Sequence, residues 1–327
     1  MQFLSILWPA GLLSFVLGLL IFAYQPAPAF AERIIIAYPS PSTSFLPLIV
    51  AQRKGFLDEE NFQTDFVRTN ISVIIQALMA GSVDYVTTST ASITARMKGV
   101  PVVAIGFFAA KPMDFLVGGK GIASAKDLKG KTVGISAQGS VTHLLTLRVL
   151  EGIGLDPAAD VTIRNIGGED VRLQALESGI IQAALLGSQG VIQGEKAGLK
   201  MIVAAADVID SLAFSGLATS VKKIKENPEQ VRRMMRASLK GLRYVWENKA
   251  GTVDVIENWL KLDKKIAAMT YDLALKSYSR NGEVEDRGIQ LTADMINARE
   301  KIEKKINVSE LVDYTPLREA RKNLAWP

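Results

Sequence analysis

The sequence predicts an α/β protein of two similar lobes, each a mainly parallel sheet flanked by helices. Short β-branched segments alternate with helical segments of about ten residues, which is the pattern of parallel βα units, and the whole pattern occurs twice. The 327 residues suffice for two domains of about 100–150 residues each. After Asn227 the strands stop and helical segments follow, which predicts a helical C-terminal tail that packs on the first lobe.

The first lobe is expected to open with a buried strand that ends at Pro39, because five apolar or β-branched residues precede this proline. Glycines then end the helical segments and small hydroxyl residues begin them. The expected elements in chain order are a strand at 33–38, a helix at 45–54, a strand at 64–68, a helix at 72–80, a strand at 82–87, a helix ending near Gly99 and a strand at 101–107.

A repeat within the chain predicts the second lobe. Residues 76–83 (QALMAGSV) match residues 174–181 (QALESGII), and at the same offset of about 98 residues the opening strand falls on residues 131–136. A repeat of this length is the size of a domain and too long for a solenoid unit. Chance similarity of ordinary βα units is the alternative, and the constant offset argues against it.

Two segments are expected to cross between the lobes and to form a hinge. Residues 114–119 would leave the first lobe and residues 213–220 would return to it. The expected domains are therefore 32–112 for the first part of lobe 1, 113–213 for lobe 2, and 214–327 for the return and the C-terminal helices. The tail helices are expected at 229–247, 252–260, 264–278, 292–306 and 317–324.

Residues 1–31 are interpreted as a signal peptide. An uncharged run from Phe3 to Tyr24 precedes the small-x-small sequence at 29–31, where a signal peptidase would cleave after Ala31. No Lys or Arg precedes the run, and about 22 apolar residues can also span a bilayer, so an uncleaved anchor or a misassigned start codon is the alternative. In either case we expect a periplasmic protein, and without Cys it is not a lipoprotein.

The composition excludes several classes of protein. The chain has no Cys and one His, so it offers no disulfide, thiolate site or His-cluster metal site. Its net charge of +5 is spread over both signs, so nucleic acid is not an expected partner. The glycine-rich residues 118–121 lack the spacing of a phosphate-binding loop, and no cofactor is expected.

Candidate ligand contacts lie in the loops that follow the strands, because α/β proteins bind ligands at the carboxyl ends of strands. Four loops carry small hydroxyl or glycine residues, at 40–44, 88–90, 136–142 and 187–190. Bare amides at a helix start favour a carboxylate, sulfonate, nitrate or phosphate group, and hydroxyls would add neutral donors. Ser and Thr are also ordinary helix caps, so a purely structural role is the alternative.

The predicted ligand-binding residues come from these loops and from aromatic positions beside them. They are Tyr38, Ser42, Thr43, Ser44, Phe45, Thr88, Ser89, Thr90, Gln138, Gly139, Ser140, Thr142, Gly187, Ser188 and Phe214. The aromatic residues Tyr38, Phe45, Phe108 and Phe214 would either wall an apolar part of the ligand or pack in the core.

The ionisable candidates are few. His143 falls in the first turn of a helix, where it would either touch an anion or stay inert and half-exposed. Asp84, Asp114 and Asp170 are candidates for binding an amino group. Nothing in the spacing brings two carboxylates together, so no catalytic residue is predicted.

Residues 124–135 (SAKDLKGKTVGI), continuing through 139–140 to 150–155 (LEGIGL), resemble the periplasmic binding proteins of ABC importers in the nitrate/sulfonate/taurine cluster, which includes thiamine-pyrimidine-precursor binders. Residues 51–57 (AQRKGFL) are similar to the same family. The resemblance implies a type II periplasmic-binding fold, a ligand in the cleft between the lobes, and handover to a separate permease and ATPase. It also implies ligand contacts from residues 38–45, 88–90, 139–140 and 187–188.

The chain departs from the pyrimidine-synthesising relatives, which have a Cys-rich motif and active-site histidines, so it is not expected to be an enzyme. The expected ligand is a small anionic solute, such as a sulfonate, nitrate or a taurine-like molecule, or a pyrimidine precursor. A ligand-sensing module for a membrane partner, and a lyase or synthase on the same fold, are the alternatives. The protein is expected to be a monomer that meets the membrane only through the transporter or an uncleaved anchor.

Overall fold

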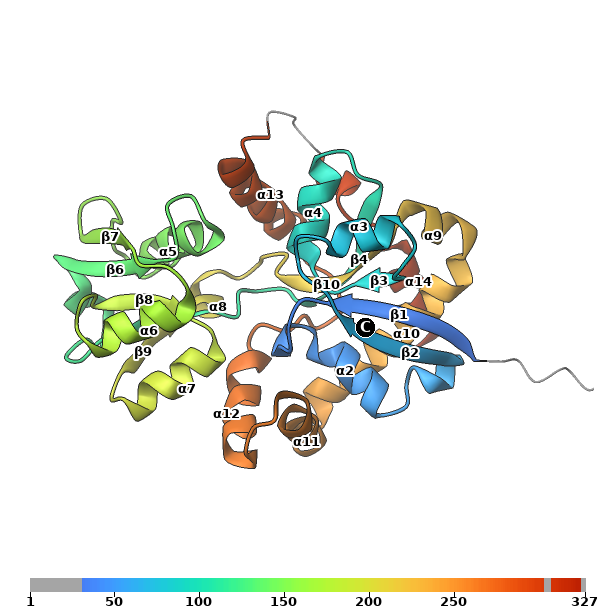
Figure 1. The fold of residues 1–327 in the computed structure, drawn as a ribbon, viewed down its shortest axis with the longest axis horizontal. Coiled ribbons are helices and arrows are strands. Elements are labelled where there is room, and N and C mark those ends of the chain that lie inside the picture. Colours follow the sequence, from blue (N-terminus) through green and yellow to red (C-terminus); the bar gives the residue numbers. More distant parts are fainter. Residues whose placement is uncertain (1–30, 303–306, 325–327) are drawn as a thin grey trace, which may run out of the picture.

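The structure, a computed structural model, describes residues 31–302 and 307–324. Two separate five-stranded sheets, each flanked by helices, lie at opposite ends of the molecule (Figure 1). This arrangement confirms the fold class predicted from the sequence. The predicted signal peptide lies outside the described residues, apart from Ala31.

The first sheet has the strand order β2-β1-β3-β10-β4. Only β10 runs antiparallel to its neighbours, so the sheet is mainly parallel as predicted. The strands are β1 (Glu32–Tyr38), β2 (Phe62–Arg68), β3 (Tyr85–Val86), β4 (Val102–Ala109) and β10 (Ser215–Ser220).

The second sheet repeats the topology of the first, with the order β7-β6-β8-β5-β9 and only β5 antiparallel. Its strands are β5 (Phe115–Gly118), β6 (Lys131–Ile135), β7 (Val161–Asn165), β8 (Ala183–Leu186) and β9 (Lys200–Ala204). In each sheet the antiparallel strand is the one that arrives from the other lobe. The internal repeat in the sequence therefore corresponds to two sheets of the same topology.

Helices cover both sheets. Those of the βα units are α2 (Leu46–Arg53), α3 (Ile74–Met79), α4 (Ser89–Met97), α5 (Val141–Gly152), α6 (Glu169–Glu177), α7 (Ser188–Lys196) and α8 (Ala205–Val208). Those of the C-terminal tail are α9 (Val221–Glu226), α10 (Pro228–Glu247), α11 (Lys249–Leu260), α12 (Lys264–Leu275), α13 (Asp286–Glu300) and α14 (Thr315–Asn323). Short 3-10 turns are η1 (Thr43–Phe45), η2 (Asp58–Glu60), η3 (Ala125–Leu128) and η4 (Val308–Glu310). None of these helices in the described chain has the length and hydrophobicity needed to cross a membrane.

Some element boundaries differ from the sequence prediction. The helix expected at 292–306 begins at Asp286, where Glu285 still has extended backbone, and it ends before Lys301, whose φ of 52° leaves the helical region. The strand expected at 82–87 shrinks to two residues, and α9 was not predicted although the Ser220 hydroxyl caps it. Boundaries of this kind depend on local backbone angles that periodicity does not contain.

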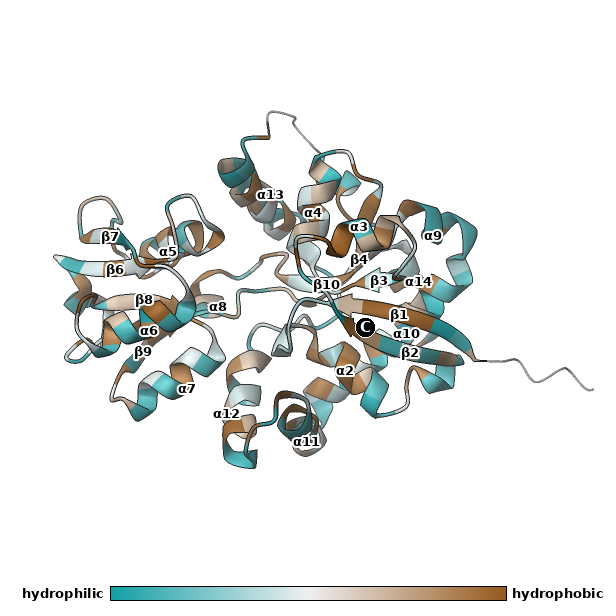
Figure 2. Cartoon of the chain, viewed as in Figure 1, coloured by the Kyte–Doolittle hydropathy of each residue, from teal (hydrophilic) through white to brown (hydrophobic). Residues whose placement is uncertain are grey.

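The apolar core of the first lobe lies between the sheet and α2, α10, α11 and α12. Much of β1 is hydrophobic, whereas α9, which follows β10, is mainly hydrophilic (Figure 2). The helices α10 and α2 pack closely, because a Cβ on Gly241 would lie only 2.0 Å from the backbone oxygen of Pro47. The tail thus completes the first lobe, as predicted.

The lobes are joined by the segments 110–114 and 209–214, which lie side by side because the Leu212 N–H donates to the Ala110 carbonyl at 2.8 Å. The tail also contacts both lobes: α12 packs against α7, and α13 packs against α4 and α5. In Figure 1, α13 and α12 lie on opposite sides of the joining segments. These two helices flank the region between the lobes.

Candidate functional site

A cavity of about 220 Å³ lies at the carboxyl ends of β1 and β3, beside the start of β10. It is the position that α/β topology predicts for a ligand. Its lining residues are Pro39, Ser40, Ser42, Ser44, Phe45, Ile71, Thr87, Thr88, Ser89, Thr90, Ala91, Phe214 and Ser215. The structure therefore brings together the predicted first-lobe candidates except Tyr38 and Thr43, and adds Ser40, Thr87 and Ser215 to them.

The most informative groups in this cavity are the hydroxyls of Thr87, Thr88 and Ser89, at the start of α4. All three oxygens are buried and have no hydrogen-bond partner among the described residues. Thr87 is 3% exposed and Ser89 is 0% exposed. Thr88 is also the N-cap residue of α4, and its side chain makes no capping bond. A buried polar group without a partner costs about 1–3 kcal/mol, so these donors indicate a missing hydrogen-bond acceptor.

The loop after β1 is held by its own hydrogen bonds. The Ser42 hydroxyl caps the η1 turn by accepting from the Ser44 N–H at 3.1 Å. The Thr43 carbonyl accepts from the Tyr278 hydroxyl at 2.6 Å, and the Thr43 side chain is buried away from the cavity. Ser42 and Ser44 line the cavity, and contact with a ligand stays a prediction for all three residues.

An aromatic cluster supports one wall of the cavity. The ring centroids of Tyr38 and Phe45 lie 5.5 Å apart, and Trp259 of α11 lies 5.4 Å from Tyr38 and 6.1 Å from Phe45. Phe45 and Phe214 reach the cavity, whereas Phe108 belongs to the core. Trp259 could not be predicted from the sequence, because α11 is about 200 residues from β1 in the chain and only tertiary packing brings them together.

The second-lobe candidates gather at the start of α5. Ser140 caps this helix, since its hydroxyl accepts from the His143 N–H at 3.1 Å and lies 2.7 Å from the Ser136 hydroxyl. The Gly139 N–H donates to His143 Nδ1 at 3.0 Å, so the buried imidazole is a structural acceptor. Gln138 is exposed. Like Tyr38 and Thr43, these second-lobe candidates do not line the first-lobe cavity, so ligand contact stays a prediction for Gln138, Gly139, Ser140 and Thr142.

At the start of α7, the Glu169 carboxylate already fills the position that an anion would take. The Gly187 N–H donates to Glu169 Oε1 at 3.1 Å, and a Cβ on Gly190 would lie 2.7 Å from the same oxygen. An anion placed at Gly187 or Ser188 would therefore meet a carboxylate. Ligand contact at these two residues stays a prediction, and the geometry favours a hydrogen-bond donor there.

Asp114 adds a second acidic group at the end of the joining segment. Its pKa is raised to about 7, chiefly by burial and also by the charge of Glu169, while the Arg172 guanidinium opposes both effects. Arg172 is itself buried, donating to the carbonyls of Gly167 at 2.7 Å and Leu185 at 3.2 Å. Burial has the opposite effect on this cation and lowers the pKa of Arg172. The second lobe thus presents acidic groups where the first lobe presents hydroxyls.

The other candidate carboxylates are separate from the cavity. Asp84 accepts from the Ile35 N–H at 2.8 Å and pairs with Lys223, so it holds the first sheet together. Asp170 is exposed in the first turn of α6. Throughout the two described ranges, no three His, Cys, Asp or Glu side chains lie close enough to hold a metal ion.

Comparison with known proteins gives the family. A family model described as "NMT1/THI5 like" matches residues 42–251, most of both lobes. The chain belongs to the NMT1/THI5-like family. Its two-sheet structure is the type II periplasmic-binding fold, which confirms the sequence resemblance to the sulfonate/nitrate/taurine cluster.

Relatives of this NMT1/THI5-like protein include binding proteins and an enzyme. The riboflavin-binding protein RibY of Chloroflexus aurantiacus is 30% identical over 62% of this chain, and the match spans 59% of RibY. The 4-amino-5-hydroxymethyl-2-methylpyrimidine phosphate synthase THI5 of Saccharomyces cerevisiae is 23% identical over 73% of each chain.

A solved structure shows the same fold. The periplasmic aliphatic sulphonate binding protein SsuA of Escherichia coli superposes with a TM-score of 0.67 at 17% identity, covering 86% of this chain and 92% of SsuA.

Proposed function

We propose that this protein is a solute-binding receptor that captures a small anionic solute between its lobes and delivers it to an ABC importer. The family membership, the two-lobed fold and the hydroxyl-lined cavity support this function. The solute would be a sulfonate, a carboxylate, nitrate, a taurine-like molecule or a pyrimidine precursor. RibY and SsuA are relatives in sequence and fold whose names show that such proteins take chemically different solutes.

The observation that carries the proposal is the set of unpartnered hydroxyls on Thr87, Thr88 and Ser89. They surround the amino end of α4, where the first N–H groups and the helix dipole already favour negative charge. An oxyanion would accept hydrogen bonds from the hydroxyls and the amides together. The geometry therefore fits an anionic head group better than a cation.

Closure of the lobes would complete the site. The solute would first bind on the first lobe, and the joining segments 110–114 and 209–214 would bend to bring the start of α5 over it. Closure is favoured only by contacts that the open form lacks. Asp114 and Glu169 would then discriminate, since they accept a donor or amino group on the solute and repel a second negative charge.

A binding role without catalysis is proposed for this chain, although THI5 is a synthase. The chain has no Cys, and its one histidine, His143, uses Nδ1 to accept from Gly139. A solute recovered chemically unchanged after incubation with the protein would support binding, whereas a converted product would favour the synthase alternative. A role as a ligand sensor would require a signalling partner in place of the importer.

The cellular setting is part of the proposal. The apolar N-terminal run and the small residues at 29–31 support export to the periplasm, with residues 1–31 removed or kept as an anchor. The proposed partners are the permease and ATPase of the importer, and the receptor would act as a monomer.

The experiment that tests the site compares two isosteric substitutions. Sulfonates, carboxylates, nitrate and pyrimidines are first screened by thermal shift, because a solute that binds the native state raises the melting temperature. Thr88→Val is then expected to weaken binding of the best solute at least tenfold by titration calorimetry, about 1.4 kcal/mol. Thr270→Val is the matched control, because Thr270 also has a buried, unpartnered hydroxyl but lies on α12. Equal affinities in both variants would refute the assignment of the site.

A further inference from the structure

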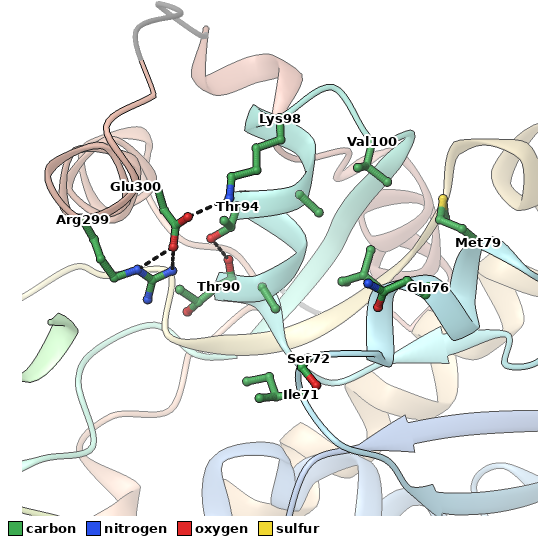
Figure 3. A pocket seen from close by; sticks show the side chains of 13 residues that line it. Ile71, Ser72, Gln76, Met79, Thr90, Thr94, Lys98, Val100, Arg299 and Glu300 are labelled. Carbon is green, nitrogen blue, oxygen red and sulfur yellow. Dashed lines mark hydrogen bonds and ion pairs between the residues drawn. The ribbon is translucent and has the colours of Figure 1, made fainter. Parts of the chain in front are cut away.

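A second and larger cavity, of about 640 Å³, opens on the outer face of α4. It runs between α3 and the end of α13 (Figure 3). We call it the α3–α4 groove. Its lining residues are Ile71, Ser72, Ile75, Gln76, Met79, Thr90, Ala91, Thr94, Ala95, Lys98, Val100, Arg299 and Glu300.

The floor and walls of the α3–α4 groove are apolar. Ile75 and Met79 come from α3, Ala91 and Ala95 come from α4, and Val100 follows α4. These side chains offer no hydrogen bond, so the groove favours hydrocarbon over a polar group.

Most of the polar side chains that line the groove already have hydrogen-bond or ion-pair partners. Lys98 Nζ lies 2.6 Å from Glu300 Oε2, and the Thr94 hydroxyl donates to the Thr90 carbonyl at 2.8 Å. Figure 3 shows the Lys98–Glu300 pair at the upper end of the groove and Ile71 at the lower end. The groove is therefore apolar along its length and charged where it ends.

Exposed apolar residues occur in the chain between the end of β2 and α3, and Ile71 among them lines the lower end of the groove. Val67, Ile71 and Val73 are 41%, 57% and 49% exposed, and all three lie at the end of β2 or in the loop before α3. Large apolar side chains grouped on a surface mark a binding site more often than isolated ones do.

The groove adjoins the hydroxyl-lined cavity. Ile71, Thr90 and Ala91 line both spaces. At the repeat offset of about 98 residues, the position of Ile71 corresponds to Glu169, which covers the start of α7 in the second lobe. The two lobes thus differ at this position. In the second lobe the Glu169 carboxylate lies against the start of α7, whereas in the first lobe Ile71 lies between the start of α4 and the α3–α4 groove.

We propose that the solute is an amphiphilic anion whose head group binds at the start of α4 and whose hydrocarbon tail lies in the α3–α4 groove. The inference rests on the proposed function and narrows it to aliphatic or aromatic sulfonates and carboxylates with an extended apolar part. Ile71 lines both the cavity and the groove, so the head group and the tail would lie on opposite sides of it. The Lys98–Glu300 ion pair at the other end of the groove would limit the length of the tail.

The test measures how affinity depends on the length of the solute's hydrocarbon chain. Titration calorimetry is carried out on protein purified after expression of the full sequence. The probes are straight-chain sulfonates and carboxylates of two, four, six and eight carbons. Burial of each added methylene is expected to strengthen binding about threefold to fourfold until the groove is full. A membrane or protein partner in the groove would instead leave affinity independent of chain length.

Two substitutions separate the tail site from the head site. Ala95→Phe fills the groove and Ile75→Asn makes it polar, and each is expected to flatten the series while leaving the two-carbon probes unchanged. Ile180→Asn is the control, because Ile180 is an exposed isoleucine of the second lobe, 55% exposed and outside the groove. Melting temperatures measured for all three show whether they are folded.

The outcomes distinguish the inference from the function on which it rests. Binding that is equally tight at two and eight carbons, or a series unaltered by both groove variants, overturns the tail site and leaves the receptor function standing. Absence of binding for every probe overturns the anionic head-group site and the inference with it.

Discussion

At the scale of single residues, the proposed chemistry depends on the three hydroxyls of Thr87, Thr88 and Ser89 at the start of α4. The sequence already marked Thr88 and Ser89 as candidates, because a run of Ser and Thr follows a strand. It could not show that Ser42 and Ser140 use their hydroxyls as caps whereas Thr88 and Ser89 do not. The sequence therefore identifies candidate hydrogen-bond donors, but whether a given hydroxyl has a partner depends on the groups that the fold places beside it.

Asp114 is expected to make stability depend on pH. In the folded protein its pKa is about 7, above its usual 3.8, so between these values the folded state keeps a proton that the unfolded chain has lost. Stability should therefore fall as the pH rises from about 4 to about 7. The free energy of unfolding is measured by chemical denaturation for Asp114→Asn and for the natural protein at pH 5 and at pH 8. The difference between the two proteins is expected to shift by about 2 kcal/mol in favour of Asp114→Asn from pH 5 to pH 8. An equal difference in unfolding free energy at both pH values would contradict the burial of the Asp114 carboxyl.

Ser140 is expected to serve both stability and binding. Ser140→Leu removes the cap of α5, which should cost about 1 kcal/mol of unfolding free energy, and should also weaken solute binding at least tenfold. Ser220→Leu removes the cap of α9 in the same way but lies outside the cavity, so it should lower the melting temperature alone. Loss of affinity in both variants would show that the Ser140 effect is only structural.

At the scale of elements, the sequence predicts the sheets better than their surroundings. Strand–helix alternation and the repeat give both sheets and their common topology, because these signals are local or periodic. The contribution of Trp259 to the cavity wall and the contacts of α12 and α13 with the second lobe were not predictable. They depend on how distant segments pack, which no local pattern encodes.

The contact between α10 and α2 gives a prediction at this scale. Gly241→Ala is expected to destabilise the protein by about 1–3 kcal/mol, because its methyl group would overlap the Pro47 carbonyl and push the two helices apart. Gly168→Ala is the control, since nothing lies within 4 Å of its added Cβ and its φ of −56° suits alanine. Urea denaturation measures both, and equal stabilities would show that α10 does not pack this closely on α2.

At the scale of the whole molecule, two sheets of one topology have diverged at their facing edges. The first lobe offers free hydroxyls and an apolar channel, and the second offers acidic groups and a capped helix. In the proposed closed form, the first lobe would hold the head group and the tail of the solute, and the second lobe would cover it. Both joining segments and the flanking α12 and α13 would then have to accommodate the closing motion.

The central claim, capture of a solute by closure of the two lobes, is tested most directly by energy transfer between them. The chain has no Cys, so Asn70→Cys and Asn165→Cys introduce the sole thiols, both exposed and one on each lobe. Saturation with a solute that raises the melting temperature should raise the transfer efficiency between dyes at these positions, and Thr88→Val should move that rise to an at least tenfold higher solute concentration. A solute that stabilises the protein while the transfer efficiency stays constant would contradict the account.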